Sequence, residues 1–201
     1  MSNFLAVDTS SKYMTVLAVK DGRCVLRHKE ECAMQHSVLL MPEVDEVLKE
    51  ADLKLSECDF VCAVTGPGSF TGIRIGISTV KGLAVGADKP EAGVTSFDLI
   101  AYNVKDENFC VVIDAAHSHY YACGYARSGE VNIPPCYLSE DEVLALRLPL
   151  YGFEQLNLKN YTKLNAGDCL EKAVLEISKK PFEKLHALYV RKSQAEEARG
   201  C

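Results

Sequence analysis

The sequence lacks any apolar run long enough to cross a bilayer, which takes about 20 residues. Its first apolar stretch, residues 4–7, ends at Asp8 and is too short for the core of a secretory signal. Positive charge is also in deficit, because 22 Lys and Arg face 28 Asp and Glu, for a formal net charge of −6. This balance argues against a protein that binds RNA or DNA on its own. We therefore expect a cytoplasmic protein without a membrane partner.

Paired cysteine spacing is missing as well, although the chain has nine cysteines. Without a CxxC pair, a structural zinc site is not expected. Cys24, Cys110 and Cys123 stand among apolar neighbours, and Cys58 and Cys62 lie in a strand-like run, so we expect reduced thiols of the core. Hydrophobic residues make up 48% of the 201 residues, which excludes a disordered chain and suits one large domain or two small ones.

The glycine-rich stretch GPGSFTGIRIG, residues 66–76, lacks the spacing of both standard nucleotide-binding loops. A P-loop requires Lys and then Ser or Thr after its last glycine, but Ile73 follows Gly72. A dinucleotide-binding loop requires a third glycine where Thr71 stands. What remains is a strand–turn–helix junction in which Ser69 or Thr71 caps the helix. The sequence leaves open whether this turn binds nothing, an anion or a partner protein.

The two halves of the chain repeat one order of elements. NFLAVDTSSKYMTVLAVKDG (3–22) aligns with NFCVVIDAAHSHYYACGYARSG (108–129), each with an apolar strand, an Asp, a polar turn, a second strand and a glycine turn. Hydrophobic spacing further predicts helices over residues 36–52, from the glycine loop to 87, after 95, and around 139–146 and 168–179. We predict an α/β fold of two duplicated β-β-β-α-β-α subdomains, residues 1–105 and 106–201, the first carrying the partner interface.

This duplicated order, with an Asp after each first strand, resembles the actin-like ATPase (ASKHA) superfamily, in which the two Asp-bearing turns face a nucleotide. The resemblance makes Asp8, Thr9 and Ser10 the candidate nucleotide-binding residues. The second turn, residues 114–116, reads DAA and offers no hydroxyl group to a phosphate. We therefore expect no independent ATP hydrolysis, and ATP or ADP only within a complex.

Five stretches together resemble the TsaB (YeaZ) family, and the resemblance covers nearly the whole chain. They are DTSS (8–11), QHSVLLMPEVDEVL (35–48), the glycine loop, IDA (113–115) and YVRKS (189–193). The resemblance implies a non-catalytic paralogue of TsaD in the bacterial tRNA threonylcarbamoyladenosine (t6A) system, where TsaD transfers the threonylcarbamoyl group. It also implies that the chain binds and activates TsaD, helps to recruit the small ATPase TsaE, forms a homodimer when alone, and meets tRNA only through the complex.

The residues themselves favour a protein without a catalytic site or a metal. A TsaD-like metal site would need two histidines four residues apart, but Leu40 stands four residues after His36. His117 and His119 lie in the second hairpin turn, and this position favours a role in the hairpin over a metal site, for which no carboxylate partner is evident. Two alternatives stay open: a metal-independent peptidase of the glycoprotease-like family, although Ser69 lies outside a GxSxG elbow, and a small actin-like ATP-binding kinase.

Two helices carry more apolar and small residues than one sheet would cover. Four consecutive apolar residues, 38–41, point all round the first helix, and glycines four apart in the second helix allow close helix packing. Packing of these glycines on the chain's own sheet is the alternative to a contact between molecules. The predicted partner interface comprises Val38, Leu39, Leu40, Met41, Gly72, Ile73, Gly76, Ile77 and Val80.

Overall fold

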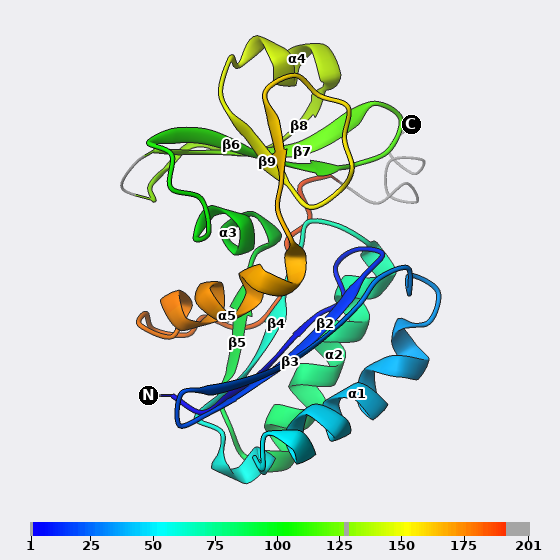
Figure 1. Ribbon diagram of the computed structural model, residues 1–201, viewed down its shortest axis with the longest axis vertical. Helices are drawn as coiled ribbons and strands as arrows, with labels where there is room; N and C mark the ends of the chain where they lie inside the picture. The colour runs from blue at the N-terminus through cyan, green and yellow to red at the C-terminus, as the bar shows by residue number, and fades with distance from the viewer. Residues whose placement is uncertain (1, 127–128, 192–201) are drawn as a thin grey trace.

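The computed structural model describes residues 2–126 and 129–191, which form two lobes, each built on a five-stranded sheet (Figure 1). The first half of the chain contains β1 (Phe4–Asp8), β2 (Met14–Lys20), β3 (Arg23–Lys29), α1 (His36–Glu50), the short 3-10 helix η1 (Leu55–Glu57), β4 (Phe60–Val64), α2 (Phe70–Ala87), β5 (Glu91–Val94) and α3 (Ser96–Ala101). The second half contains β6 (Asn108–Asp114), β7 (His119–Ala126), β8 (Val131–Ser139), α4 (Glu140–Ala145), β9 (Leu150–Gly152), β10 (Tyr161–Lys163) and α5 (Ala166–Ile177).

The strand order of the second sheet repeats that of the first. The first sheet runs β3-β2-β1-β4-β5 and the second, in the same sense, β8-β7-β6-β9-β10. In both sheets the first three strands pair antiparallel and the last two run parallel to the first strand. This topology confirms the predicted duplicated actin-like α/β fold.

The two halves differ in their last crossover. Helix α2 connects β4 to β5 in the first half, whereas residues 153–160, which connect β9 to β10, contain no helix. In the first half, β5 and α3 follow the six elements of the repeat, and the helix predicted after residue 95 is α3. In the second half, the helix predicted around 168–179 is α5, and β10 is an additional strand before it. Strand β10 has three residues, too few to show the alternation by which a strand is recognised in a sequence.

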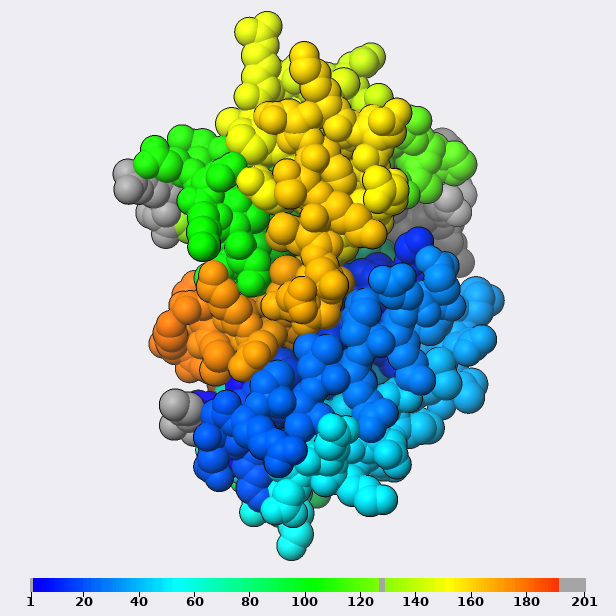
Figure 2. Space-filling view, in the orientation of Figure 1, coloured from blue at the N-terminus to red at the C-terminus, as the bar shows by residue number. Residues whose placement is uncertain are grey.

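Both faces of the first sheet are covered by helices. Helices α1 and α2 pack on one face, and α5, from the second half of the chain, packs on the other against β1, β2, β3 and β5. Figure 2 shows α5 (orange) lying between the two lobes against the β2–β3 hairpin (blue). Because both faces are covered, β1 and β4 read as continuous apolar runs without alternation.

One apolar core is shared by the two lobes. Side chains of β1 and β4 on the α5 side meet α3, α5 and the inner face of β6 and β7. Members of this cluster include Phe4, Leu17, Phe60, Phe97, Val111, Tyr125, Leu170 and Val174. The proposed division at residue 105 therefore separates segments that share a core, and remains a prediction.

The chain after α5 returns along the first lobe. We call residues 181–191 the C-terminal strap. Leu185 is 1% exposed within the core under α1 and α2, and the Leu188 N–H donates to the Thr65 carbonyl at 2.8 Å. No helix in the described part of the chain is long and apolar enough to cross a membrane.

Four of the five cysteines predicted for the core are buried, but Cys24 is exposed, so that part of the prediction is wrong. Cys24 lies on β3, where side chains alternate and the neighbouring Val25 points inward instead.

Candidate functional site

The two predicted aspartates occupy equivalent turns where the lobes face each other. In the first turn the Ser10 N–H donates to Asp8 Oδ1 at 2.8 Å, and in the second the Ala116 N–H donates to Asp114 Oδ1 at 2.9 Å. Each carboxylate therefore closes its own turn two residues on, a common use of Asp. The repeat detected in the sequence thus extends to the hydrogen bonds of the turns.

The three predicted nucleotide-binding residues lie too deep to contact a ligand in this structure. Asp8 and Thr9 are 1% exposed and Ser10 is 3% exposed. The Thr9 hydroxyl donates to the Gly72 carbonyl at 2.7 Å, and the Ser10 carbonyl accepts from the Ser69 N–H at 2.6 Å. Their polar groups hold the glycine loop, so in this structure these residues attach the loop, and their contact with a nucleotide stays a prediction.

The glycine loop packs backbone to backbone on this turn. A Cβ atom at Gly72 would lie 1.9 Å from the Thr9 carbonyl oxygen, and one at Gly68 would lie 2.1 Å from the Ser10 carbonyl oxygen. No side chain fits at either position. Ser69 caps α2, as predicted, by accepting from the Gly72 N–H at 3.2 Å. The glycines therefore serve a close internal contact, and the loop does not have the open backbone of a phosphate cradle.

Six residues of the predicted partner interface are buried inside the chain, so their assignment to its surface is wrong. They are Leu40, Gly72, Ile73, Gly76, Ile77 and Val80. Position 76 shows the physical reason, because a Cβ there would lie 2.6 Å from Thr9 Oγ1 and the small residue lets α2 approach β1. Of the other three, Val38 is 71% exposed, Met41 is 42% exposed and Leu39 is half-buried. The predicted partner surface narrows to these three residues.

The sequence reasoning missed other exposed apolar residues on the same two helices. Phe70 at the start of α2 is 41% exposed, and Val85 near its end is 82% exposed. The Arg74 guanidinium lies 3.7 Å from the centre of the Phe70 ring, a cation–π contact that keeps the ring at the surface. We call Val38, Met41, Phe70, Arg74 and Val85 the outer face of α1 and α2. A large side chain in the first turn of a capped helix was the available signal for Phe70.

The histidines singled out in the sequence have structural partners. His36 is buried as the first residue of α1, with Nε2 3.0 Å from the Tyr13 carbonyl oxygen. His119 Nδ1 lies 2.8 Å from the His117 carbonyl oxygen, and its ring stacks on Tyr137. Over residues 2–126 and 129–191, no three His, Cys, Asp or Glu side chains gather as metal ligands would.

A cavity of about 300 Å³ opens beside the first Asp turn, between β3 and the chain around β9 and β10. Its lining includes Lys12, Tyr13, His28, Glu30, Glu31, Phe153, Glu154 and Lys163. Three carboxyl groups thus face two ammonium groups, and Lys12 already pairs with Glu31 at 2.7 Å. The Lys and Glu side chains of this cavity therefore offer no surplus of positive charge to a polyphosphate.

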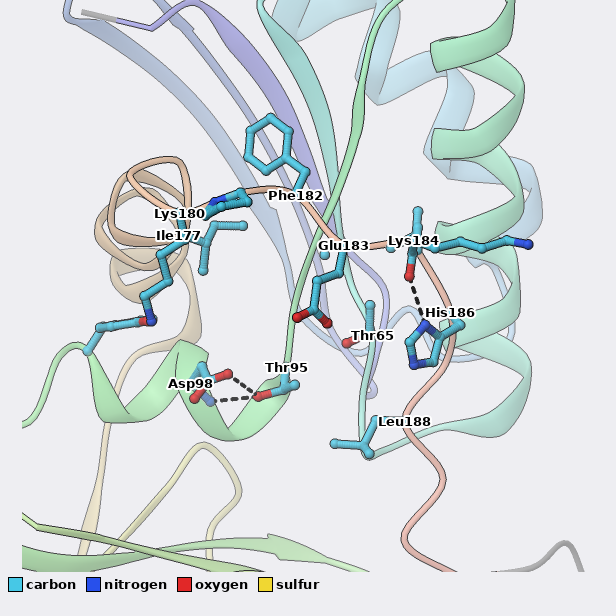
Figure 3. A pocket seen from close by; sticks show the side chains of 14 residues that line it. Thr65, Thr95, Asp98, Ile177, Lys180, Phe182, Glu183, Lys184, His186 and Leu188 are labelled. Carbon is cyan, nitrogen blue, oxygen red and sulfur yellow. Dashed lines mark hydrogen bonds between the residues drawn. The ribbon is translucent and has the colours of Figure 1, made fainter. Parts of the chain in front are cut away.

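A larger cavity, about 540 Å³, lies elsewhere, between α3, the end of α5 and the C-terminal strap (Figure 3). Its polar groups serve the fold. Thr95 caps α3 and donates its hydroxyl to Asp98 at 2.8 Å, and the buried Tyr125 hydroxyl donates to the same carboxylate at 2.9 Å. His186 Nδ1 lies 2.7 Å from the Lys184 carbonyl oxygen within the strap. The cavity is therefore a gap left between the C-terminal strap, α3 and the end of α5, and its polar groups are already used by the fold.

Comparisons with known proteins agree on one family. A family model described as "TsaD: tRNA N6-adenosine threonylcarbamoyltransferase" matches residues 28–188. The "tRNA threonylcarbamoyladenosine biosynthesis protein TsaB" of Escherichia coli K12 is 34% identical over 127 residues, 61% of this chain and 54% of that protein. The Bacillus subtilis 168 protein of the same name is 29% identical over 119 residues, 58% of this chain and 52% of that protein. The chain thus spans about half the length of the curated relatives it matches.

Two solved structures from Pseudomonas aeruginosa share the fold over nearly the full chain. "YeaZ from Pseudomonas aeruginosa" is 25% identical with a TM-score of 0.74, covering 89% of this chain and 93% of that one. A protein described as having similarity to peptidase YEAZ is also 25% identical, with a TM-score of 0.78, covering 95% of this chain and 100% of that one.

Proposed function

Because the chain belongs to the TsaD family, and within it to the TsaB (YeaZ) proteins, we propose that it is a non-catalytic subunit in the biosynthesis of t6A in tRNA. It binds a TsaD-type partner, keeps that partner in its active arrangement and helps to recruit TsaE. Contact with tRNA is made through the complex, and the chain pairs with itself when the partner is absent.

The observation that carries the proposal is the closed first turn. A phosphate-transferring member of this fold needs the turn after its first strand to be open to the ligand, but residues 8–10 are buried and hold the glycine loop. The second turn offers no hydroxyl group, and the adjoining cavity has more acidic than basic side chains. An actin-like kinase is disfavoured on the same grounds.

A peptidase is disfavoured by the environment of Ser69. Its side-chain oxygen accepts the Gly72 N–H and so caps α2, which is a structural role. A serine nucleophile needs a base within hydrogen-bond reach, and the hydrogen bond that Ser69 makes is to the backbone of its own helix.

The outer face of α1 and α2 is the surface that supports a partner. Val38 and Met41 lie three residues apart on α1, which places them on one side of the helix. Phe70 and Val85 are exposed apolar residues of the neighbouring helix α2. An exposed apolar area of this kind gains free energy when a second protein covers it.

Co-purification and a t6A formation assay with purified TsaD, TsaE and unmodified tRNA test the proposal. We expect no product from the chain alone, and product from the full set that is lost when the chain is omitted. The double variant Val38→Glu with Met41→Glu should stay folded by circular dichroism but lose TsaD and product. Val131→Glu makes the same exchange at a 47% exposed valine of β8 and serves as the matched control, which should retain both.

The proposal fails if the chain is dispensable for product, or if it turns over ATP or tRNA by itself. If the double variant binds TsaD as the control does, the partner surface lies elsewhere while the function can still stand.

A further inference from the structure

Tyr13 is a side chain of the first lobe that is enclosed by the second. It stands just before β2 and is 8% exposed. Its ring meets Phe153 edge-on, with centroids 5.9 Å apart, and lies 5.3 Å from the His28 ring. Phe153 directly follows β9 of the second sheet. The pair therefore bridges the two lobes beside the cavity of about 300 Å³, which both rings line.

Two carboxyl groups lie near this bridge, one from each lobe. Glu154 Oε2 is buried and has no hydrogen-bond partner among the described residues, whereas the Asp8 carboxylate lies within hydrogen-bonding reach of the Tyr13 side chain. Both charges act on the Tyr13 phenol, whose pKa is raised by burial first and then by these two groups. An ionised carboxylate without a partner is costly to bury, whereas a protonated carboxyl costs much less. The closed arrangement thus suits a neutral Glu154.

We propose that Tyr13 is the wedge that holds the two lobes together, and that loss of the Glu154 proton loosens this contact. We call this contact between the lobes the latch. It is pH-sensitive, because the lobes stay together while Glu154 is neutral and separate more often once Glu154 is charged. The charged and titratable groups that face Glu154 determine how well its ionised carboxylate is stabilised. On the first lobe these are Asp8, Lys12, Tyr13, His28, Glu30 and Glu31, and on the second Asp114 and Lys163.

This environment disfavours the charged form on balance. Burial, helped by the Asp114 charge, raises the pKa of Glu154 to about 7, although hydrogen bonds from the backbone of Glu154 and Phe153 and the charge of Lys12 act in the opposite direction. Lys12 is held by Glu31, which limits its help. The unfolded chain releases this proton near 4.5. Protonated Glu154 therefore stabilises the closed fold fully below pH 4.5, and this contribution is lost as the pH rises through about 7.

Hydrogen–deuterium exchange of the full chain, corrected for the intrinsic pH dependence of exchange, measures the opening directly. Because Glu154 has a pKa of about 7 when buried and 4.5 when exposed, proton linkage makes the opening equilibrium about tenfold larger at pH 8 than at pH 6. We expect this change in peptides that cover residues 8–14 and 150–156. Glu154→Gln, a neutral isostere, should exchange equally at both pH values. Glu31→Gln removes a carboxyl from the same cavity and should keep the wild-type pH dependence.

Tyr13→Ala should raise exchange in both peptides at both pH values, whereas Tyr13→Phe keeps the ring and should remain closed. Phe153→Ala removes the wedge contact from the other lobe if Tyr13→Ala does not fold. Wild-type protection in a folded Tyr13→Ala or Phe153→Ala chain overturns the wedge. If exchange in Glu154→Gln still rises tenfold between pH 6 and pH 8, Glu154 does not control the opening and the proposed latch is wrong. This comparison tests the role of Glu154 even if both alanine variants fail to fold.

Discussion

Glycine serves two purposes along a single helix, α2. Gly72 and Gly76 face β1, where a Cβ would meet Thr9. Gly82 and Gly86, with the same four-residue spacing, have nothing within 4 Å of an added Cβ. The sequence shows four equivalent glycines, and only their surroundings distinguish those that the fold requires from those that it tolerates.

We expect Gly72→Ala to destabilise the fold by about 3 kcal/mol or more, because its Cβ would force the backbones of α2 and the first turn apart. Gly82→Ala is the matched control and should stabilise the fold by about 1 kcal/mol, the difference in helix propensity. Urea unfolding followed by circular dichroism compares the two. Equal effects at the two positions would show that helix propensity alone governs α2, and that the contact with Thr9 is unimportant.

At the scale of elements, the C-terminal strap contains no helix or strand, and a few of its residues attach it to the first lobe. Leu185 enters the core beside Gly93, its N–H donates to Glu91 Oε1 at 3.2 Å, and Leu188 continues the attachment at Thr65. Further along, the Tyr189 ring packs against the Phe70 ring in a tilted arrangement, with ring centroids 5.3 Å apart. The strap thus ties the edge of the first sheet to the start of α2.

We expect Leu185→Ala to cost about 2–4 kcal/mol, because it removes a fully buried side chain and leaves a cavity. His186→Ala changes the next residue, which is exposed, and should alter stability by less than about 0.5 kcal/mol. Thermal unfolding of the two variants side by side measures the difference. If Leu185→Ala unfolds like His186→Ala, the strap is only loosely attached to the first lobe.

For the whole molecule, the shared core matters more than the repeat. The repeat predicts two similar subdomains, but α5 covers the first sheet and the inner face of the second sheet joins the same cluster. Neither half therefore buries its own apolar surface alone. The molecule should unfold as one cooperative unit rather than as two.

A fragment of residues 1–105 tests this shared core. It would expose the sheet face that carries Phe4, Leu17 and Phe60, so we expect no cooperative thermal transition from the fragment alone. Co-expression with residues 106–201 should restore the transition and give a complex that co-purifies. A fragment 1–105 that melts cooperatively near the temperature of the full chain would instead establish it as an independent domain.

Local patterns in the sequence determined the strands and helices, because those patterns act over a few neighbouring residues. The first helix was predicted over 36–52 and spans His36–Glu50. The cap of the second was predicted at Ser69 or Thr71 and is Ser69, and both aspartates stand at the ends of first strands. The duplicated topology followed from comparing the halves, and the motifs indicated the family.

Burial was decided only by the tertiary structure, since it depends on contacts between residues far apart in the chain. The sequence could not show that Thr9 meets Gly72, which turned predicted surface glycines into internal ones and a predicted ligand turn into a closed one. Nor could the sequence show that Tyr13 of the first lobe contacts Phe153 of the second. Periodicity states which side of a helix or strand is apolar, whereas packing alone decides whether that side meets its own sheet, the other lobe or a second protein.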